Sequence, residues 1–136
     1  MSKGVREERE LVRILDRLGF AVLRAPASGS RTKLDRPDLL AGRKGFIVAL
    51  EVKTTSRETL YLGEESVAQL LRFSRRFGAK PLLAVKFKHR KRGWLLVEAE
   101  GLKRTGRGFK LTLREALRRG FTPEALVTGK LENMLS

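Results

Sequence analysis

Phe46-Ile47-Val48-Ala49-Leu50-Glu51-Val52-Lys53 is the stretch of sequence that decides the fold. Its first five residues are apolar without interruption, which is typical of a strand at the centre of a sheet covered on both faces. Glu51 and Lys53 then place two charges on the same run. Residues two apart on a strand share a face, with backbone positions roughly 7 Å apart. The stretch therefore predicts a buried strand that opens into a polar cleft.

A second strand is predicted immediately upstream, at Asp38-Leu39-Leu40-Ala41-Gly42, after Pro37. Arg43-Lys44-Gly45 provides a tight turn between the two strands. Antiparallel pairing across this turn would bring Asp38 close to Glu51. Two carboxylates held together repel one another unless a cation joins them. Mg²⁺ is a suitable cation, because it commonly takes one or two carboxylates together with water and substrate phosphate.

The pattern Asp38, Glu51 and Lys53 is therefore a candidate hydrolytic site. A metal bound by the two carboxylates can activate a water molecule and stabilise charge on a scissile phosphate. Lys53 could orient or deprotonate that water, or stabilise the transition state by its charge. The alternative is that Glu51 and Lys53 form an ordinary surface ion pair, worth at most about 1 kcal/mol.

A helix is predicted from about Gly4 to Leu18, ended by Gly19, and it contributes a further acidic residue. Its apolar stripe at helical spacing is formed by Leu11, Val12, Ile14, Leu15 and Leu18. Glu8 projects within this stripe, where a carboxylate is costly to bury without a cation. It could help to bind metal, or hold Lys53 or Arg24. Equally, its place near the helix start could simply be favoured by the helix dipole.

The remaining pattern alternates strands and helices. A short strand is predicted at 20–23, loops at 25–37 and 54–62, a helix at 64–77, and strands at 82–87 and 93–98. Thr112 and Glu115 have capping-box spacing for a helix that reaches about Arg119, and Thr122-Pro123-Glu124 has the chemistry of a last short turn. We expect a single α/β domain spanning residues 1–136, with a central mixed five-stranded sheet flanked by helices.

The composition indicates which partners this domain has. Lys and Arg number 30 against 15 Asp and Glu, giving a formal net charge of +15. Nucleic acid is the expected partner because neutralising phosphates releases counterions, and an anionic membrane surface is the weaker alternative. The chain has no cysteine, and its one histidine, His89, excludes sites that need two. No apolar run reaches the roughly 18 residues of a membrane span, and the start lacks the apolar region of a signal peptide. We therefore expect a cytoplasmic protein that does not have a membrane as its partner.

Taken together, the motifs resemble the archaeal Holliday junction resolvase family, a branch of the PD-(D/E)xK nuclease superfamily. The resemblance spans about residues 3–97. It rests on the catalytic motif and on Lys3-Gly4 with Glu8-Arg9-Glu10, Gly19-Phe20-Ala21-Val22-Leu23-Arg24, Tyr61-Leu62-Gly63, Phe73-Ser74-Arg75-Arg76-Phe77-Gly78 and Pro81-Leu82-Leu83-Ala84-Val85-Lys86-Phe87. The part from 101 to 136 matches the family poorly.

This resemblance implies a restriction-endonuclease-like core and a set of roles. Glu8, Asp38 and Glu51 would bind Mg²⁺, with Mn²⁺ as a possible substitute, and Lys53 would complete the catalytic set. Arg9 and Arg24 match functional basic positions that grip phosphate. The family members are homodimers that nick four-way junctions in pairs during recombination and repair, and Phe73 and Phe77 match the dimer-forming helix. Ordinary core packing is the alternative for this aromatic pair.

The loop at 25–37 is longer than the family's short Ser-Gly-Ser-type segment. It contains Asp35, which could take the metal-binding role in place of Asp38. Asp38 is preferred because the strand pattern follows it directly. Further DNA-binding candidates flank the site: Ser30, Arg31, Lys33, Arg36, Thr54 and Arg57.

A nuclease acting on flaps or linear duplex and a non-catalytic junction-binding protein are the alternative functions. A protein partner such as a sliding clamp is not derivable from these motifs.

Overall fold

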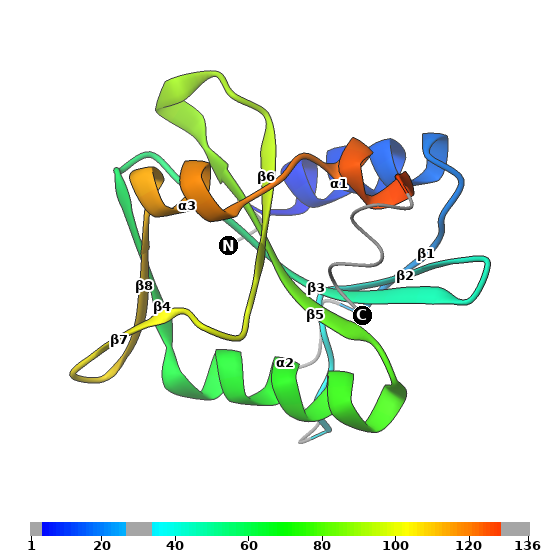
Figure 1. Cartoon of the computed structure of the whole chain (residues 1–136), viewed down its shortest axis with the longest axis horizontal. Helices are drawn as coiled ribbons and strands as arrows, with labels where there is room; N and C mark the ends of the chain where they lie inside the picture. The colour runs from blue at the N-terminus through cyan, green and yellow to red at the C-terminus, as the bar shows by residue number, and fades with distance from the viewer. Residues whose placement is uncertain (1–3, 27–33, 129–136) are drawn as a thin grey trace.

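The computed structural model describes residues 4–26 and 34–128. Its main sheet has five strands in the order β1-β2-β3-β5-β6 (Figure 1). These strands are β1 (Ala21–Arg24), β2 (Leu39–Arg43), β3 (Phe46–Thr55), β5 (Lys80–Phe87) and β6 (Trp94–Glu98). β3 and β5 are parallel and the other neighbours are antiparallel. The predicted mixed five-stranded sheet is confirmed, with the predicted central strand in the middle.

β2 and β3 form the hairpin that the sequence predicts. Arg43 pairs with Phe46, so only Lys44 and Gly45 form the turn, and both have positive φ, at 54° and 85°. Two positive φ values are characteristic of a type I′ turn, whose twist matches that of the flanking strands. The register runs on to a pair between Leu39 and Leu50.

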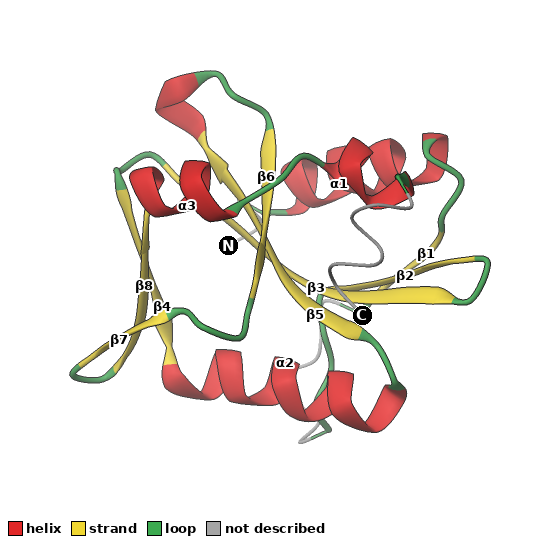
Figure 2. Cartoon of the chain, viewed as in Figure 1, coloured by secondary structure: helices red, strands yellow, loops and turns green. Residues whose placement is uncertain are grey.

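Helices cover both faces of this sheet (Figure 2). α1 (Val5–Arg17) packs its fully buried Leu11 and Leu15 against one face, in a cluster that includes Leu50 and Leu82. α2 (Glu64–Phe77) lies against the other face, where Leu70 packs with residues such as Ala49. Because β3 is covered on both sides, Val48, Ala49 and Leu50 are completely buried, as the uninterrupted apolar run predicts, whereas Phe46 and Ile47 at its start are half-buried.

A second, three-stranded sheet was not predicted. Its order is β4-β8-β7, formed by β4 (Thr59–Gly63), β8 (Gly108–Thr112) and β7 (Lys103–Thr105). The predicted loop at 54–62 is therefore wrong at both ends, since β3 extends through Thr55 and β4 begins at Thr59. Strands of three to five residues carry too little alternation to be recognised, and β4 depends on pairing with a segment about 50 residues away.

The C-terminal part contains α3 (Leu113–Arg119) and the 3₁₀ helix η3 (Pro123–Val127), while η2 (Lys88–Arg90) follows β5. The predicted capping residue is confirmed, because the Glu115 backbone N–H donates to Thr112 Oγ1 at 3.1 Å. Within the described ranges, no helix is long and apolar enough to cross a membrane.

Candidate active site

The β2–β3 hairpin brings the two predicted carboxylates together. Asp38 directly precedes β2, and the register that pairs Leu39 with Leu50 places it opposite Glu51. Its Oδ2 atom accepts a hydrogen bond of 2.8 Å from the backbone N–H of Val52, which fixes the side chain against β3. Glu51 is 9% exposed and is one of two buried polar residues in the described chain. The predicted proximity of the two acids is thus confirmed.

Burial and mutual repulsion change the acidity of both groups. Burial raises the pKa of Glu51 to about 7, and the charges of Asp38 and Glu8 act in the same direction while Lys53 opposes them. Burial also raises the pKa of Asp38 from its ordinary range, against the hydrogen bond from Val52. The two carboxylates therefore occupy a site where negative charge is costly unless a cation compensates it.

The side chains fit a divalent cation. Glu51 Oε1 is buried and has no hydrogen-bond partner among the described residues. A bare, buried carboxylate oxygen next to a second carboxylate is the kind of donor set that Mg²⁺ takes. No three acidic or histidine side chains within 4–26 and 34–128 form a protein-only metal site. Water and substrate phosphate would have to complete the coordination, which is usual for Mg²⁺.

Lys53 lies on the same face of β3 as Glu51, as the two-residue spacing predicts. Its Nζ atom is 3.9 Å from Glu51 Oε2, which makes an ion pair without a close hydrogen bond. The side chain is 36% exposed, whereas that of Glu51 is 11% exposed. The ammonium group is thus at the mouth of the acidic site, where it can reach a bound phosphate.

Glu8 reaches the site from α1 and is held by β1. Arg24 Nε donates to Glu8 Oε1 at 2.8 Å. The sequence left Lys53 and Arg24 as possible partners of Glu8, and in the structure the partner is Arg24. The charge of Glu8 raises the pKa values of both Asp38 and Glu51, which shows that it lies near them. Glu8 therefore adds negative potential to the site while Arg24 fixes its orientation.

Asp35 does not share the site with Glu51. Two guanidinium nitrogens of Arg72, on α2, donate to its carboxylate. Nε donates to Oδ2 and Nη2 donates to Oδ1, each at 2.9 Å. This partner lowers the pKa of Asp35. The structure therefore ties Asp35 to α2 and places Asp38 beside Glu51, in agreement with the preference based on the strand pattern.

The other predicted DNA-binding residues are spread around the site. Ser30, Arg31 and Lys33 lie outside the described residues. Arg9 and Arg57 are exposed, and Thr54 is half-buried directly after Lys53. The backbone N–H of Arg36 donates to Gln69 Oε1 at 3.4 Å, which places the backbone of this residue beside α2.

Phe73 and Phe77 form a surface feature on α2. Their rings stack with centroids 5.2 Å apart and an interplanar angle of 15°. Phe77 is 49% exposed, so ordinary core packing does not account for it. The pair lines an open hollow of about 420 Å³ together with Leu34, Asp35, Arg36 and Arg76.

Three contacts that orient α1 were not predicted from sequence. Lys86 Nζ and Trp94 Nε1 both donate to Glu10 Oε1, at 2.6 and 3.0 Å. Lys88 Nζ lies 3.6 Å from Glu7 Oε2. The sequence does contain a signal for these contacts. Glu7 and Glu10 lie three residues apart on one edge of the helix, and a basic segment that could pair with them follows β5. These contacts bind α1, and with it Glu8, to the end of the central sheet.

Comparisons with known proteins agree with this geometry. A family model described as "Archaeal holliday junction resolvase (hjc)" matches residues 1–130. The chain is 45% identical over 85 residues to the crossover junction endodeoxyribonuclease Hjc of Methanocaldococcus jannaschii, covering 62% of this chain and 59% of that protein. It is 38% identical over 110 residues to the protein of the same name from Archaeoglobus fulgidus, covering 81% and 79%. The solved structure of Archaeoglobus fulgidus Hjc, a Holliday junction resolvase from an archaeal hyperthermophile, matches with a TM-score of 0.84 at 31% identity, over 92% of this chain and 100% of that chain.

Proposed function

The chain belongs to the archaeal Holliday junction resolvase family, and on this premise we propose that it resolves four-way DNA junctions by paired phosphodiester hydrolysis. The observation that carries the proposal is the carboxylate pair of the half-buried Asp38 and the buried Glu51, with Lys53 at its mouth. Perturbed acids of this kind, whose pKa values are raised mainly by burial and further by neighbouring carboxylates, are typical of catalytic sites rather than of surfaces that only bind DNA. A net charge of +15 supplies the attraction for the substrate.

Asp38 and Glu51 would hold the metal, which we propose to be Mg²⁺ with Mn²⁺ as a substitute. When bound, the cation makes a water molecule more acidic and stabilises the charge that develops on the scissile phosphate. The buried Glu51 Oε1 offers it an oxygen that no hydrogen bond occupies. Glu8 adds negative potential and, held by Arg24, completes the acidic set.

Lys53 and two arginines would act on the phosphate. Lys53 is positioned to stabilise negative charge in the transition state or to orient the attacking water, because its ammonium group lies beside the acids and is exposed. Arg24 is near enough to hold Glu8 and still 31% exposed, so it can also face the DNA. Arg9 is exposed one residue after Glu8 and would grip a neighbouring phosphate.

We further propose that the protein works as a homodimer on chromosomal DNA in the cytoplasm. Paired nicks need two active sites, and the described residues of one chain provide one such site, at Asp38 and Glu51. The stacked Phe73 and Phe77, with Phe77 half exposed, supply an aromatic surface of the kind enriched at protein interfaces. A two-fold dimer would bury this surface against its own copy.

Incubation with labelled DNA tests the activity. Four-way junction and linear duplex of the same sequence are each mixed with the protein, with and without Mg²⁺. Symmetric nicks in the junction alone, dependent on Mg²⁺, are the expected result. Cutting of linear duplex at a similar rate would indicate a nuclease with another substrate, and binding without cutting would indicate a non-catalytic junction protein.

A further inference from the structure

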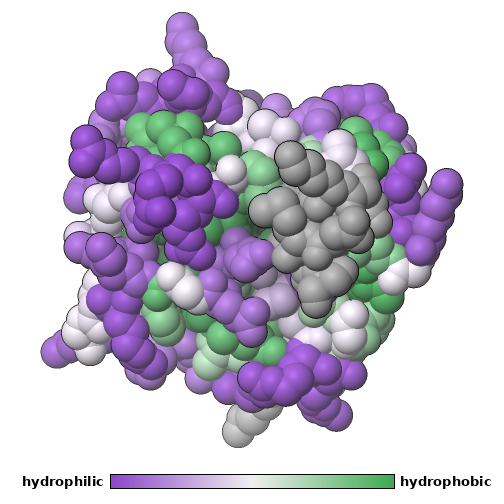
Figure 3. All heavy atoms as spheres, viewed as in Figure 1, coloured by the Kyte–Doolittle hydropathy of each residue, from purple (hydrophilic) through white to green (hydrophobic). Residues whose placement is uncertain are grey.

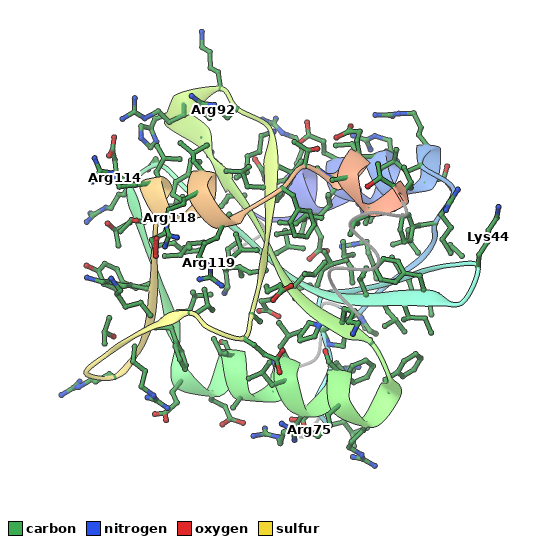
Figure 4. All side chains as sticks on the ribbon, in the orientation of Figure 1. Lys44, Arg75, Arg92, Arg114, Arg118 and Arg119 are labelled. Atoms are coloured by element: carbon green, nitrogen blue, oxygen red, sulfur yellow. The ribbon has the colours of Figure 1, made fainter. Side chains whose placement is uncertain are left out.

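An open groove of about 660 Å³ lies between η2 and α3, outside the acidic site. We call it the η2–α3 groove, and its lining residues are Glu58, Arg90, Arg92, Leu113, Arg114, Leu117 and Arg118. Figure 4 shows Arg92, Arg114 and Arg118 gathered at one corner of the molecule, with Lys44 at the opposite edge. In Figure 3 this corner is crowded with hydrophilic side chains around a small apolar patch.

The groove carries an excess of positive charge that the protein does not use internally. Four of its lining residues are arginines and one is acidic. Arg90 is paired with Glu58, and Arg118 with Glu115 on the same helix. Among the residues that the structure describes, no hydrogen bond or ion pair engages Arg92 or Arg114. Both side chains are exposed and available to a ligand.

Arg119 shows what a structural arginine looks like in the same helix. Its guanidinium donates to the backbone carbonyls of Gly101 and Glu100, at 3.1 and 3.3 Å, and so holds the turn after β6. Arg92 and Arg114 have no comparable contact within the described ranges. Their presence in the groove is therefore not explained by the stability of the fold.

The groove is connected to the active site by short links. Glu58 follows Lys53 by five residues, which span at most about 18 Å when extended. η2 is tied to α1 by the ion pair of Lys88 with Glu7, one residue before Glu8. Since duplex DNA rises about 3.4 Å per base pair, about 18 Å corresponds to roughly five base pairs. An arm of a junction cut at the active site is long enough to reach the groove.

We propose that the η2–α3 groove binds the phosphate backbone of a junction arm that leads away from the cut, with Arg92 and Arg114 as the contacting residues. The inference rests on the proposed function and assigns a role to the C-terminal part of the chain. Arginine suits this ligand because its planar fork matches phosphate oxygens. An acidic protein segment is the less suitable occupant, since Leu117, 41% exposed, is the only exposed large apolar side chain in the lining.

Binding of four-way junction to the full-length protein tests the groove. Affinity is measured in EDTA, where cleavage does not interfere, over a series of salt concentrations. The variant R92Q/R114Q removes two groove charges, and the matched control R17Q/K44Q removes two exposed charges from the far end of α1 and the β2–β3 turn. We expect roughly tenfold weaker binding for the groove variant and a salt dependence reduced by about two phosphate contacts. The control should bind much more nearly like the wild type.

Neutral methylphosphonate linkages identify the DNA contact. Placed in turn along one arm outward from the cut, they should weaken wild-type binding at the positions that face the groove and leave that of R92Q/R114Q nearly unchanged, because the contact is already lost. Equal binding by R92Q/R114Q and R17Q/K44Q, with a wild type that cuts junctions normally, would overturn the groove and leave the proposed function intact. A wild type that neither binds nor cuts junctions would instead refute the proposed function itself.

Discussion

Replacing Glu51 by glutamine is expected to stabilise the metal-free protein at alkaline pH while it abolishes cleavage. Burial raises the pKa of Glu51 in the folded chain to about 7, against 4.5 for the ordinary carboxyl. A group with a raised pKa stabilises the fold fully only below its unfolded value, and the contribution is lost as the pH rises to its folded value. As the pH rises from about 4.5 to 7 this contribution is lost, so the penalty for ionising Glu51 is complete above about pH 7, and glutamine removes it.

The magnitude follows from the two pKa values. The difference between about 7 and 4.5 corresponds to about 3 kcal/mol at pH 8, since one pKa unit is worth 1.36 kcal/mol. The amide that replaces the carboxyl is still buried, and no side chain or backbone group of the described residues forms a hydrogen bond at the position of Glu51 Oε1. This unpaired polar group offsets part of the gain, so we expect a net gain of about 2 kcal/mol. For a chain of this length, that gain raises the midpoint of thermal unfolding by roughly 5–10 °C. At pH 5 the gain should fall below about 1 kcal/mol, because the wild-type carboxyl is then mostly protonated.

Thermal unfolding in EDTA at pH 5 and pH 8 measures this effect. Glu100→Gln serves as the matched control, because it makes the same change at an exposed position. Added Mg²⁺ at pH 8 should stabilise the wild type and the control, and should leave Glu51→Gln nearly unaffected. The reasoning is refuted if Glu51→Gln is no more stable than Glu100→Gln at pH 8, or if Mg²⁺ stabilises it as strongly as the wild type.

Four further substitutions test the neighbouring assignments. Arg24→Ala releases Glu8 from its ion pair and should lower the cleavage rate roughly 10–100-fold, as loss of an orienting partner does; an unchanged single-turnover rate would remove Arg24 from the site. Asp38→Asn should abolish cleavage, whereas Asp35→Asn should leave the cleavage rate of the same junction within about twofold, because Asp35 is bound to α2. Phe73→Ala should weaken the dimer at least about tenfold in sedimentation and make the two nicks uncoordinated. A dimer of unchanged affinity would exclude Phe73 from the interface.

The central hairpin could be predicted because its information is local. The apolar run before Glu51, the turn at Lys44 and Gly45, and the strand after Asp38 lie within 16 residues, and together they determine which side chains face each other. Once the register is fixed, the proximity of the two acids follows. The same reasoning placed Lys53 on the shared face.

The parts that could not be predicted depend on contacts between distant segments. β4 pairs with β8, and neither strand is long enough to be recognised by its own alternation. The choice of Arg24 as the partner of Glu8 depends on how α1 packs beside β1, which the helix pattern alone leaves open. The η2–α3 groove likewise forms because β8 and α3 return to lie beside the basic turn after β5. The sequence predicts the helix that ends near Arg119, but not that this helix faces the turn after β5.

The cleavage rate of a four-way junction as a function of Mg²⁺ tests the central claim most directly. It is measured under single-turnover conditions for the wild type and for Glu51→Gln, with junction binding followed in parallel. The wild type should show no cutting in EDTA and a saturable dependence on Mg²⁺, and Glu51→Gln should bind the junction with wild-type affinity and leave it uncut. Cutting in EDTA, or cutting by Glu51→Gln at the wild-type rate, would show that the carboxylate pair of Asp38 and Glu51 is not the site of hydrolysis.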